Sequence, residues 1–344
     1  MIMNSKTDVQ SQPPTGAWKN RKVLVTGADG FIGSHLVERL VAEGASVRAF
    51  CLYNSQGSRG WLEQSPPAVR DAVDFRLGDI RDARFVDESC RDVEVVFHLA
   101  ALIAIPYSYT APESFVDTNV RGTLNVLEAA RRCGVRRLVH TSTSEVYGTP
   151  ATLPIRETHP LSAQSPYAAT KVAADQLAIS YQRSFGTPVT VLRPFNTYGP
   201  RQSTRAVLPT ILLQLMSGQR EISLGRLDTK RDLTYVGDTV SGFLSAGAAT
   251  GVEGQTIQLG TGRSVSIAEL FAAACRVLGT DARAVEDKTR LRPDASEVLV
   301  LESDPSLAAE RLGWRPTVTL EEGLHATVTW LREHRGDYRQ THSV

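Results

Sequence analysis

The stretch KVLVTGADGFIGSHLVERL, residues 22–40, decides the fold. Its first five residues form a short run of strand length, the next seven contain three glycines, and apolar residues then recur at helical spacing. A strand, a glycine turn and a helix in this order are typical of a dinucleotide site, because glycines let backbone N–H groups approach a diphosphate and a helix amino terminus attracts negative charge. The cofactor-binding residues predicted here are Gly27, Gly30, Phe31, Ile32 and Gly33.

Strand-like and helical patterns alternate along most of the chain. Further short apolar runs lie at 47–52, 73–77, 94–99, 137–143, 188–194 and 256–259. This alternation predicts an α/β fold with a parallel, doubly wound (Rossmann) sheet. We expect a flexible tail at 1–20, an NAD-binding domain at 21–193 to which residues 232–262 return, and a smaller carboxyl-terminal α/β substrate lobe at 194–344.

Composition argues against several classes of function. The chain has 38 Lys and Arg against 37 Asp and Glu, so no bulk charge draws it to nucleic acid or to a membrane. No apolar run reaches the length of a membrane span, and the amino-terminal residues lack the apolar segment of a signal peptide. The four cysteines form no CxxC pair, which indicates reduced thiols and argues against structural zinc. We expect a cytoplasmic protein with no metal, nucleic-acid partner or membrane partner.

The second predicted strand, at 47–52, lacks the acidic residue with which many NAD sites hold the ribose hydroxyls. Cys51 stands there, and no Asp or Glu occurs within 45–60. No arginine directly follows the strand to bind a 2′-phosphate either. These residues leave NAD and NADP open, with Asn54 as a candidate ribose contact.

The loops after the third and fourth strands offer further cofactor contacts. The first is placed to meet an adenine ring, and the second has small side chains that permit close approach. The candidates are Asp79, Ile80, Leu99, Ala100 and Ala101. His98 lies inside the fourth apolar run, and we predict it to be a hydrogen-bonded core residue rather than a catalytic one.

The chemistry is expected where the fifth strand ends and a long helix begins. The strand ends near Thr143, which places polar residues at the carboxyl edge of the sheet, where ligands bind. Tyr167 and Lys171 follow in a helix and, being four residues apart, share one face. A nearby ammonium favours a phenolate, so this pair suits a tyrosine base tuned by lysine, although the same spacing also occurs by chance.

Several motifs in order resemble the extended short-chain dehydrogenase/reductase family, and within it the nucleotide-sugar epimerases and dehydratases. The resemblance spans about 21–335 and rests on TGADGFIG, HLAA, TSTSEVYG, YAATK, RPFNTYGPRQ, RDLTYVGD, RPDASEV and LGWRP. It implies bound NAD, with NADP less favoured, and a nucleotide-sugar substrate. It also implies a homodimer that pairs through helices at about 112–133 and 166–185.

The resemblance assigns catalytic roles by position. Tyr167 would take the proton of the sugar 4-hydroxyl while carbon C4 is oxidised, and Lys171 would hold the nicotinamide ribose. Thr143 would form a hydrogen bond with the sugar hydroxyl. Asn119, in the preceding helix, is expected to support the active-site strand.

Three further positions resemble the family's ligands for the substrate diphosphate. Asn196 matches the amide ligand, and Arg231 and Arg292 match the paired arginines that neutralise the charge. A diphosphate favours charge-assisted, bidentate donors, although either arginine alone is also compatible with a surface salt bridge.

Glu145 decides the subclass. A 4-epimerase needs only oxidation and reduction at C4, whereas a 4,6-elimination also needs a base for the C5 proton. Thr143, Ser144 and Glu145 resemble the serine version of the motif in GDP-mannose dehydratases, but Thr-Ser-Glu also occurs among UDP-glucuronate decarboxylases. Ser144 is a poor acid, so the group that protonates the departing C6 hydroxyl stays open, and Glu145 could serve for both transfers.

The exit of the second strand, CLYNSQGSRGWLE, together with TSTSEVYGT resembles the bacterial NAD-dependent 4,6-dehydratases of legionaminic-type pathways, which act on nucleotide-linked N-acetylglucosamine. That subgroup would explain Cys51 at the place of the ribose acid. We therefore expect an NDP-hexose 4,6-dehydratase that makes a 4-keto-6-deoxy sugar nucleotide, with the base open. The alternatives are a 4-epimerase, a UDP-glucuronate decarboxylase or a non-catalytic cofactor sensor.

Overall fold

The computed structural model describes residues 16–287, 290–291 and 293–338. Its main element is a seven-stranded sheet in the order β10-β6-β5-β4-β1-β2-β3, in which each pair of neighbouring strands is parallel. The strands are β1 (Lys22–Thr26), β2 (Ser46–Leu52), β3 (Asp74–Gly78), β4 (Val95–His98), β5 (Arg137–Thr141), β6 (Val189–Pro194) and β10 (Thr256–Leu259). The predicted α/β fold with a doubly wound parallel sheet is confirmed.

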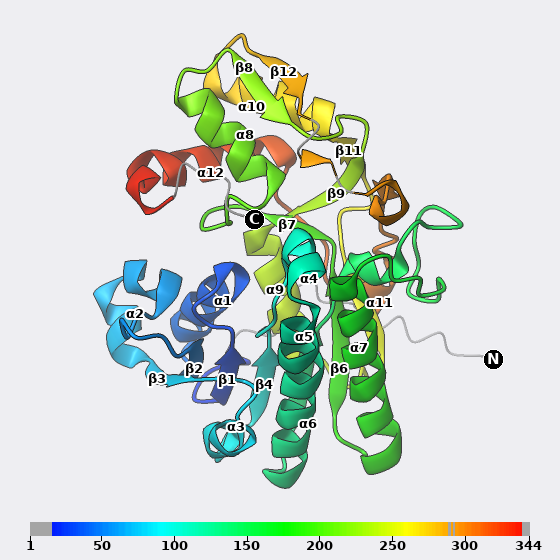
Figure 1. The fold of residues 1–344 in the computed structure, drawn as a ribbon. Helices are drawn as coiled ribbons and strands as arrows, with labels where there is room; N and C mark the ends of the chain where they lie inside the picture. The colour runs from blue at the N-terminus through cyan, green and yellow to red at the C-terminus, as the bar shows by residue number, and fades with distance from the viewer. Residues whose placement is uncertain (1–15, 288–289, 292, 339–344) are drawn as a thin grey trace, which may run out of the picture.

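Helices cover both faces of this sheet (Figure 1). Successive side chains of a strand point to opposite faces, so Val23 and Val25 of β1 pack in one apolar cluster and Leu24 packs in another. The first cluster includes α1 (Phe31–Ala42), α9 (Val236–Ala248) and α11 (Ser306–Leu312). The second includes α3 (Ala83–Cys90), α6 (Gly122–Arg132) and α7 (Pro166–Phe185). Burial on both faces explains why these strands read as continuous apolar runs.

A smaller lobe stands above the carboxyl ends of the large sheet in Figure 1 and has an apolar core of its own. That core includes α8 (Val207–Met216), β8 (Glu221–Leu224), α10 (Ile267–Leu278) and α12 (Leu320–Glu333), and β12 (Arg283–Glu286) pairs with β8. Between the lobes, β9 (Lys230–Tyr235) pairs with β7 (Asn196–Tyr198), β11 (Ser264–Ser266) and β13 (Val300–Leu301). The chain therefore returns to the large sheet at α9, after β9.

The helical course expected at 112–133 is interrupted. It consists of α5 (Pro112–Phe115), a π-helical segment of six residues (Val116–Arg121) and α6. A π-helical segment widens the helix locally and is common at functional sites. The buried Asn119 lies in this segment, which therefore sets the position of its side chain.

The shorter helices complete the connections: α2 (Pro67–Ala72), α4 (Ile105–Thr110) and 3₁₀ turns at Gly60–Gln64, Ser144–Tyr147, Asp294–Ser296 and Arg335–Asp337. Within the described ranges, no helix has both the length and the apolar character needed to span a membrane.

The beginning of the described chain is part of the fold. Trp18 is buried, with its ring centroid 5.6 Å from that of Phe97 on β4. The flexible tail expected at 1–20 therefore does not extend to Trp18, because an indole packed against the sheet fixes the backbone beside it. Residues 1–15 lie outside the described residues.

Candidate active site

The turn after β5 carries three of the predicted catalytic residues. Thr143 caps the 3₁₀ turn Ser144–Tyr147, since its side chain accepts a hydrogen bond of 3.3 Å from the backbone N–H of Glu145. Thr143 and Glu145 are half-buried, whereas Ser144 is buried. The cap holds the Glu145 backbone at the carboxyl edge of the sheet, beside the beginning of α7.

Helix α7 brings the remaining two catalytic candidates to this turn. The side chain of Ser165 caps it by accepting from the N–H of Ala168 at 3.1 Å, and Pro166 occupies the first helical position. Tyr167 and Lys171 are both buried on the same side of the helix. The phenol of Tyr167 forms a hydrogen bond with the side chain of Thr143, so the strand turn and the helix meet through these two hydroxyls.

The electrostatics of the pair differ from the sequence expectation. Burial raises the pKa of Tyr167 above its usual range, the hydrogen bond with Thr143 opposes this, and the charge of Glu145 raises the pKa further. Lys171 donates from Nζ to the backbone carbonyl oxygen of Thr141 at 2.6 Å, and burial lowers its pKa to about 8. Desolvation therefore dominates the titration of Tyr167, where tuning by Lys171 was expected.

A buried ionic cluster beneath the site was missed from the sequence. The Asp175 carboxylate accepts from Ser142 Oγ at 2.7 Å and from Arg193 Nη2 at 2.8 Å, and it lies 3.3 Å from His140 Nε2. Burial acts to raise the pKa of Asp175, but His140, Arg193 and Lys171 outweigh it and hold that pKa below its usual range. The available signal was spacing, since Asp175 follows Lys171 by four residues in α7.

Asn119 connects two segments around the site. Its Oδ1 accepts from the Leu102 N–H at 2.8 Å, and its Nδ2 donates to the Leu102 carbonyl at 2.9 Å and to Thr170 Oγ1 at 3.0 Å. It therefore supports α7 and the loop after β4 and makes these contacts in place of the expected ones with the active-site strand.

The glycine turn between β1 and α1 has no room for side chains at two positions. Gly27 has φ of +67°, and a Cβ added to it would lie 2.8 Å from the backbone nitrogen of Ala100. A Cβ added to Gly33 would lie 2.1 Å from the carbonyl oxygen of Gly27. The turn and the loop after β4 thus approach each other at the backbone level, as the predicted cofactor residues require.

The amino terminus of α1 is suited to hold a diphosphate. Gly30 is its N-cap and makes no side-chain hydrogen bond there. The first backbone N–H groups of a helix have no partner within the helix, so those of Phe31, Ile32 and Gly33 are available to donate to an anion. The residues present therefore fit the diphosphate of a dinucleotide.

His98 is a hydrogen-bonded core residue, as predicted. Its Nδ1 lies 2.8 Å from Thr26 Oγ1, and its Nε2 lies 3.1 Å from Thr123 Oγ1. Burial holds its pKa well below the usual value, so the ring is neutral. Thr26 Oγ1 also accepts from the N–H groups of Leu99 and Ala100 at 3.2 Å each, which fixes the loop predicted to approach the cofactor. Ala101 is the next residue of that loop.

The residues predicted to contact the adenosine end of the cofactor are already engaged in contacts within the protein. Asp79 is held by Arg81, whose hydrogen bond lowers the Asp79 pKa, and Ile80 is a buried core residue. Asn54 uses its side chain within its own loop: Oδ1 accepts from Ser58 N at 3.0 Å, and Nδ2 donates to Ser58 O at 2.8 Å and to Leu52 O at 3.2 Å. Asn54 therefore shapes the loop after β2, because its amide groups are already engaged there.

The predicted diphosphate ligands lie on the strands between the lobes. Asn196 is on β7, and its Oδ1 is buried with no hydrogen-bond partner among the described residues. Arg231 is on β9, with Nη2 3.3 Å from Glu297 Oε1 and Nη1 3.0 Å from the Lys230 carbonyl oxygen. Arg292 lies outside the described residues.

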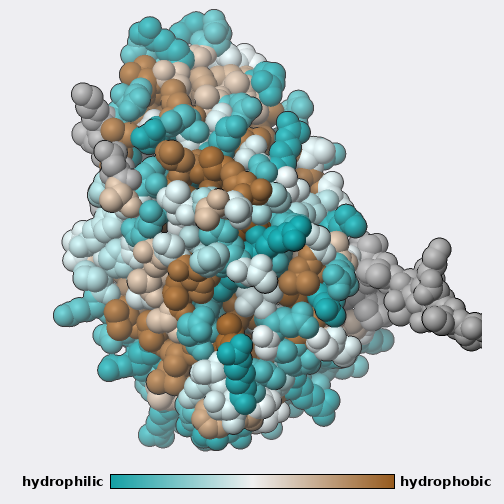
Figure 2. All heavy atoms as spheres, turned by 90° about the vertical axis from the view of Figure 1, so that its right-hand side faces the viewer, coloured by the Kyte–Doolittle hydropathy of each residue, from teal (hydrophilic) through white to brown (hydrophobic). Residues whose placement is uncertain are grey.

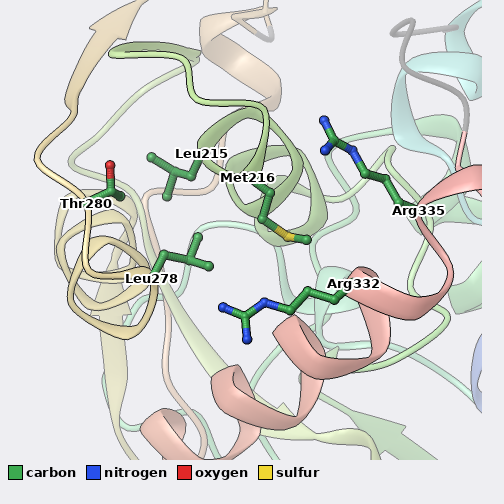
Figure 3. Close-up of a pocket in the computed structure, with 6 residues that line it drawn as sticks. All are labelled: Leu215, Met216, Leu278, Thr280, Arg332 and Arg335. Atoms are coloured by element: carbon green, nitrogen blue, oxygen red, sulfur yellow. The ribbon is translucent and has the colours of Figure 1, made fainter.

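Two hollows open elsewhere in the described part of the chain. One of about 330 Å³ lies between α8, α10 and α12, with Arg332 and Arg335 on one side (Figure 3). Its lining includes none of the predicted site residues. Another of about 300 Å³ lies next to the glycine turn and is lined by Asp29, Gly60, Trp61, Gln64 and Asp337.

Comparisons with known proteins agree with this geometry. The family model described as GDP-mannose 4,6 dehydratase matches residues 24–327. A UDP-glucose 4-epimerase of Mycolicibacterium smegmatis is 36% identical over 90% of this chain and 98% of its own length. A dTDP-glucose 4,6-dehydratase of Streptomyces antibioticus is 34% identical over 91% of this chain and 93% of its own.

Solved structures give the same result. The dTDP-glucose 4,6-dehydratase of Streptomyces venezuelae, solved with NAD bound, has a TM-score of 0.82 and 32% identity, and the match covers 92% of this chain and 98% of that one. The UDP-glucose 4-epimerase of Thermotoga maritima, solved with UDP-glucose, has a TM-score of 0.83 and 31% identity over 91% of this chain and 99% of that one. The resemblance to the nucleotide-sugar epimerases and dehydratases is confirmed, and the comparisons do not extend to the legionaminic-type subgroup. The chain belongs to the GDP-mannose 4,6-dehydratase family of nucleotide-sugar dehydratases and epimerases.

Proposed function

We propose that this protein is an NAD-dependent 4,6-dehydratase of a nucleotide-linked hexose. The observation that carries the proposal is the position of Glu145 on the capped turn after β5, which contacts the helix α7 that presents Tyr167. The charge of Glu145 also raises the pKa of the phenol. Elimination requires a base for the C5 proton near Tyr167, which acts on the 4-hydroxyl. Epimerisation at C4 requires no such base.

NAD fits the residues of the proposed cofactor site. The turn at Gly27 and Gly33 leaves no room for side chains, and the amino terminus of α1 offers backbone donors to a diphosphate. Solved relatives hold NAD, among them the Streptomyces venezuelae dehydratase. When bound, NAD would supply the hydride acceptor for oxidation at C4 and, once reduced, the hydride donor for C6.

The side chains of the site handle the protons. Burial disfavours the phenolate of Tyr167, whereas the positive charge of a bound oxidised nicotinamide would favour it. As a phenolate, Tyr167 takes the proton of the 4-hydroxyl while C4 is oxidised, and the Thr143 hydroxyl holds the phenol in position through their hydrogen bond. The 4-keto group then acidifies C5–H. Glu145 removes that proton and delivers it to the C6 oxygen, which leaves as water, because the hydroxyl of Ser144 is too weak an acid for this transfer. When C6 is reduced, C5 takes up one proton, which balances the proton that Tyr167 took from the 4-hydroxyl.

Asn196 and Arg231 are proposed to hold the substrate diphosphate, with Arg292 as the expected second arginine. Asn196 Oδ1 is buried without a partner among the described residues. A nucleotide sugar supplies both hydroxyl donors and phosphate acceptors, so it offers partners to both ends of an amide. A guanidinium such as that of Arg231 suits the phosphate oxygens.

The sugar is proposed to be N-acetylglucosamine, on the resemblance of the segment after β2. The experiment that tests the function incubates the purified protein with GDP-, UDP- and dTDP-linked hexoses, each with and without the N-acetyl group, and follows the products by mass spectrometry. Loss of one water from an N-acetylglucosamine nucleotide is the expected result. If only a hexose without the N-acetyl group lost water, the dehydratase reaction would be supported and N-acetylglucosamine as its sugar would be contradicted.

A 4-epimerase is the second candidate, and the 36% identity to the Mycolicibacterium smegmatis UDP-glucose 4-epimerase favours it. Its product would have the mass of the substrate and a different chromatographic mobility. A UDP-glucuronate decarboxylase would release carbon dioxide from UDP-glucuronate. If the protein formed an isomeric product or released carbon dioxide, and no hexose lost water, the proposed dehydratase function would be contradicted.

A homodimer is proposed through the helices at 112–133 and 166–185. Large apolar side chains are exposed on these segments: Val116 is 51%, Leu124 37% and Phe185 57% exposed. Apolar patches between hydrophilic ones are also visible on the face drawn in Figure 2. Val116→Glu combined with Leu124→Glu should halve the mass measured by light scattering, whereas Val285→Glu on β12 should leave it unchanged. The four free thiols fit the cytoplasmic location expected from the sequence.

A further inference from the structure

The exit of β2 offers no acid of its own to a ribose. Cys51 is fully buried, and Leu52, the last residue of the strand, is 56% exposed and has a side chain without a hydrogen-bonding group. In sheets of this kind, the adenosine of a dinucleotide extends from the glycine turn toward the end of this strand, where its ribose hydroxyls need an acceptor. Another element must therefore supply the acceptor if the site is to hold a ribose.

Asp29, in the glycine turn, places a carboxylate at this exit. Its Oδ2 lies 3.4 Å from the backbone nitrogen of Leu52, within hydrogen-bond distance. The neighbouring thiol of Cys51 is affected by the same charge: burial raises the pKa of Cys51 to about 12, and Asp29 contributes to that rise. Asp29 and the end of β2 are thus in contact although they are far apart in sequence.

The loop after β2 fixes the backbone of Asp29. The Asp29 carbonyl oxygen accepts from the Trp61 N–H at 3.1 Å. Gly60 packs so closely that an added Cβ would lie 2.4 Å from that oxygen. The Asn54 side chain holds the loop in shape by bonding Ser58. The carboxylate is therefore presented from a rigid turn, which lowers the cost of ordering it on binding.

The nearby arginines are engaged elsewhere. Arg48 binds Asp74 at 2.8 Å and the Ser89 carbonyl oxygen at 2.8 Å. The guanidinium of Arg59 lies over the ring of Phe75, 4.2 Å from its centroid. Asp29 itself is partly desolvated, since burial raises its pKa. A carboxylate in this state gains from hydroxyl donors and repels a phosphate.

We propose that Asp29 accepts hydrogen bonds from the adenosine ribose hydroxyls of NAD, in place of the acid missing from β2, and that it discriminates against the 2′-phosphate of NADP. This inference rests on the proposed NAD-dependent function. It assigns the selectivity between NAD and NADP to a residue of the glycine turn. In folds of this kind, a residue at the end of the second strand ordinarily determines that selectivity.

A competition experiment tests the assignment without turnover. The purified protein is incubated with equimolar NADH and NADPH and desalted, and the retained dinucleotides are released and quantified. Wild type should retain NADH in large excess. Asp29→Asn and Asp29→Ser should lower the retained NADH-to-NADPH ratio by about 10- to 100-fold, the loss expected for a hydrogen bond to a charged group.

Asp337→Asn is the matched control, because Asp337 lines the same hollow beside the glycine turn. It removes one negative charge there and should leave the ratio unchanged. Thermal melting without nucleotide establishes whether each variant is folded. If Asp29→Asn is not folded, Asp29→Ser provides the test.

The possible results separate the two proposals. An unchanged ratio in folded Asp29 variants, or an equal fall in Asp337→Asn, would overturn the role of Asp29 while leaving NAD-dependent catalysis intact. A wild-type protein that retains neither dinucleotide would overturn the proposed function itself, and with it this inference.

Discussion

Lys171 Nζ lies 2.6 Å from the backbone carbonyl oxygen of Thr141, the last residue of β5. This hydrogen bond connects α7 to the end of the strand that leads into Thr143. Because Tyr167 and Lys171 lie on one side of α7, the contact also fixes the phenol beside the Thr143 hydroxyl. The ammonium therefore has a structural role in addition to any role toward a cofactor.

The first prediction concerns stability and pH. Burial lowers the pKa of Lys171 from 10.5 to about 8, so between these values the folded protein holds fewer protons than the unfolded chain. Stability from this group therefore rises with pH across that window. Between about pH 7.5 and about pH 9.5, the difference in free energy of unfolding between wild type and Lys171→Met should shift by about 2 kcal/mol in favour of wild type.

Urea denaturation at the two pH values measures this shift. Lys22→Met, at an exposed position of β1, is the control and should show no such change. A constant difference between wild type and Lys171→Met would contradict the buried, pH-sensitive ammonium.

The second prediction concerns the ionic cluster beneath the site. Asp175→Asn leaves the buried Arg193 without its charged partner, so it should lower the free energy of unfolding by about 3–5 kcal/mol. Glu43→Gln breaks the exposed pair with Arg39 and should cost about 0.5 kcal/mol or less. Equal effects of the two variants in chemical denaturation would show that the buried cluster contributes no special stability.

The third prediction concerns the glycine turn. Gly33→Ala places a methyl group 2.1 Å from the Gly27 carbonyl oxygen, so the first turn of α1 must move and the diphosphate donors move with it. The amount of dinucleotide retained after purification should fall by about tenfold or more, as for loss of one charged hydrogen bond or its equivalent. Gly336→Ala, whose added Cβ meets nothing within 4 Å, should retain the wild-type amount. Full retention by a folded Gly33→Ala protein would show that the turn is not the diphosphate site.

The positions of the strands along the chain could be predicted, because the strands of the large sheet are largely buried on both faces and therefore appear as apolar runs. Strands β1 and β10 have the predicted bounds. The π-helical segment around Asn119 could not be predicted, because it depends on how the helix packs against the Leu102 loop and α7 and not on composition.

The site residues that are close together in sequence could be predicted. Those whose roles depend on contacts between distant segments could not. Tyr167, Lys171 and the Thr143 turn were indicated by spacing and by a strand end. The roles of Asp29 and Asn54 depended on how the loop after β2 folds back onto the glycine turn, which no local pattern describes. Burial also reversed the expected titration of Tyr167, since a sequence shows which charges are near but not how much water is excluded.

Glu145→Gln tests the proposed elimination most directly. With the substrate found by the nucleotide-sugar screen, this variant should oxidise C4 and accumulate NADH, seen as nicotinamide absorbance, while releasing no dehydrated product. Tyr167→Phe, the comparison variant, should accumulate no NADH because the first proton transfer fails. Wild-type rates of water loss by Glu145→Gln, measured by mass spectrometry, would contradict the assignment of Glu145 as the base.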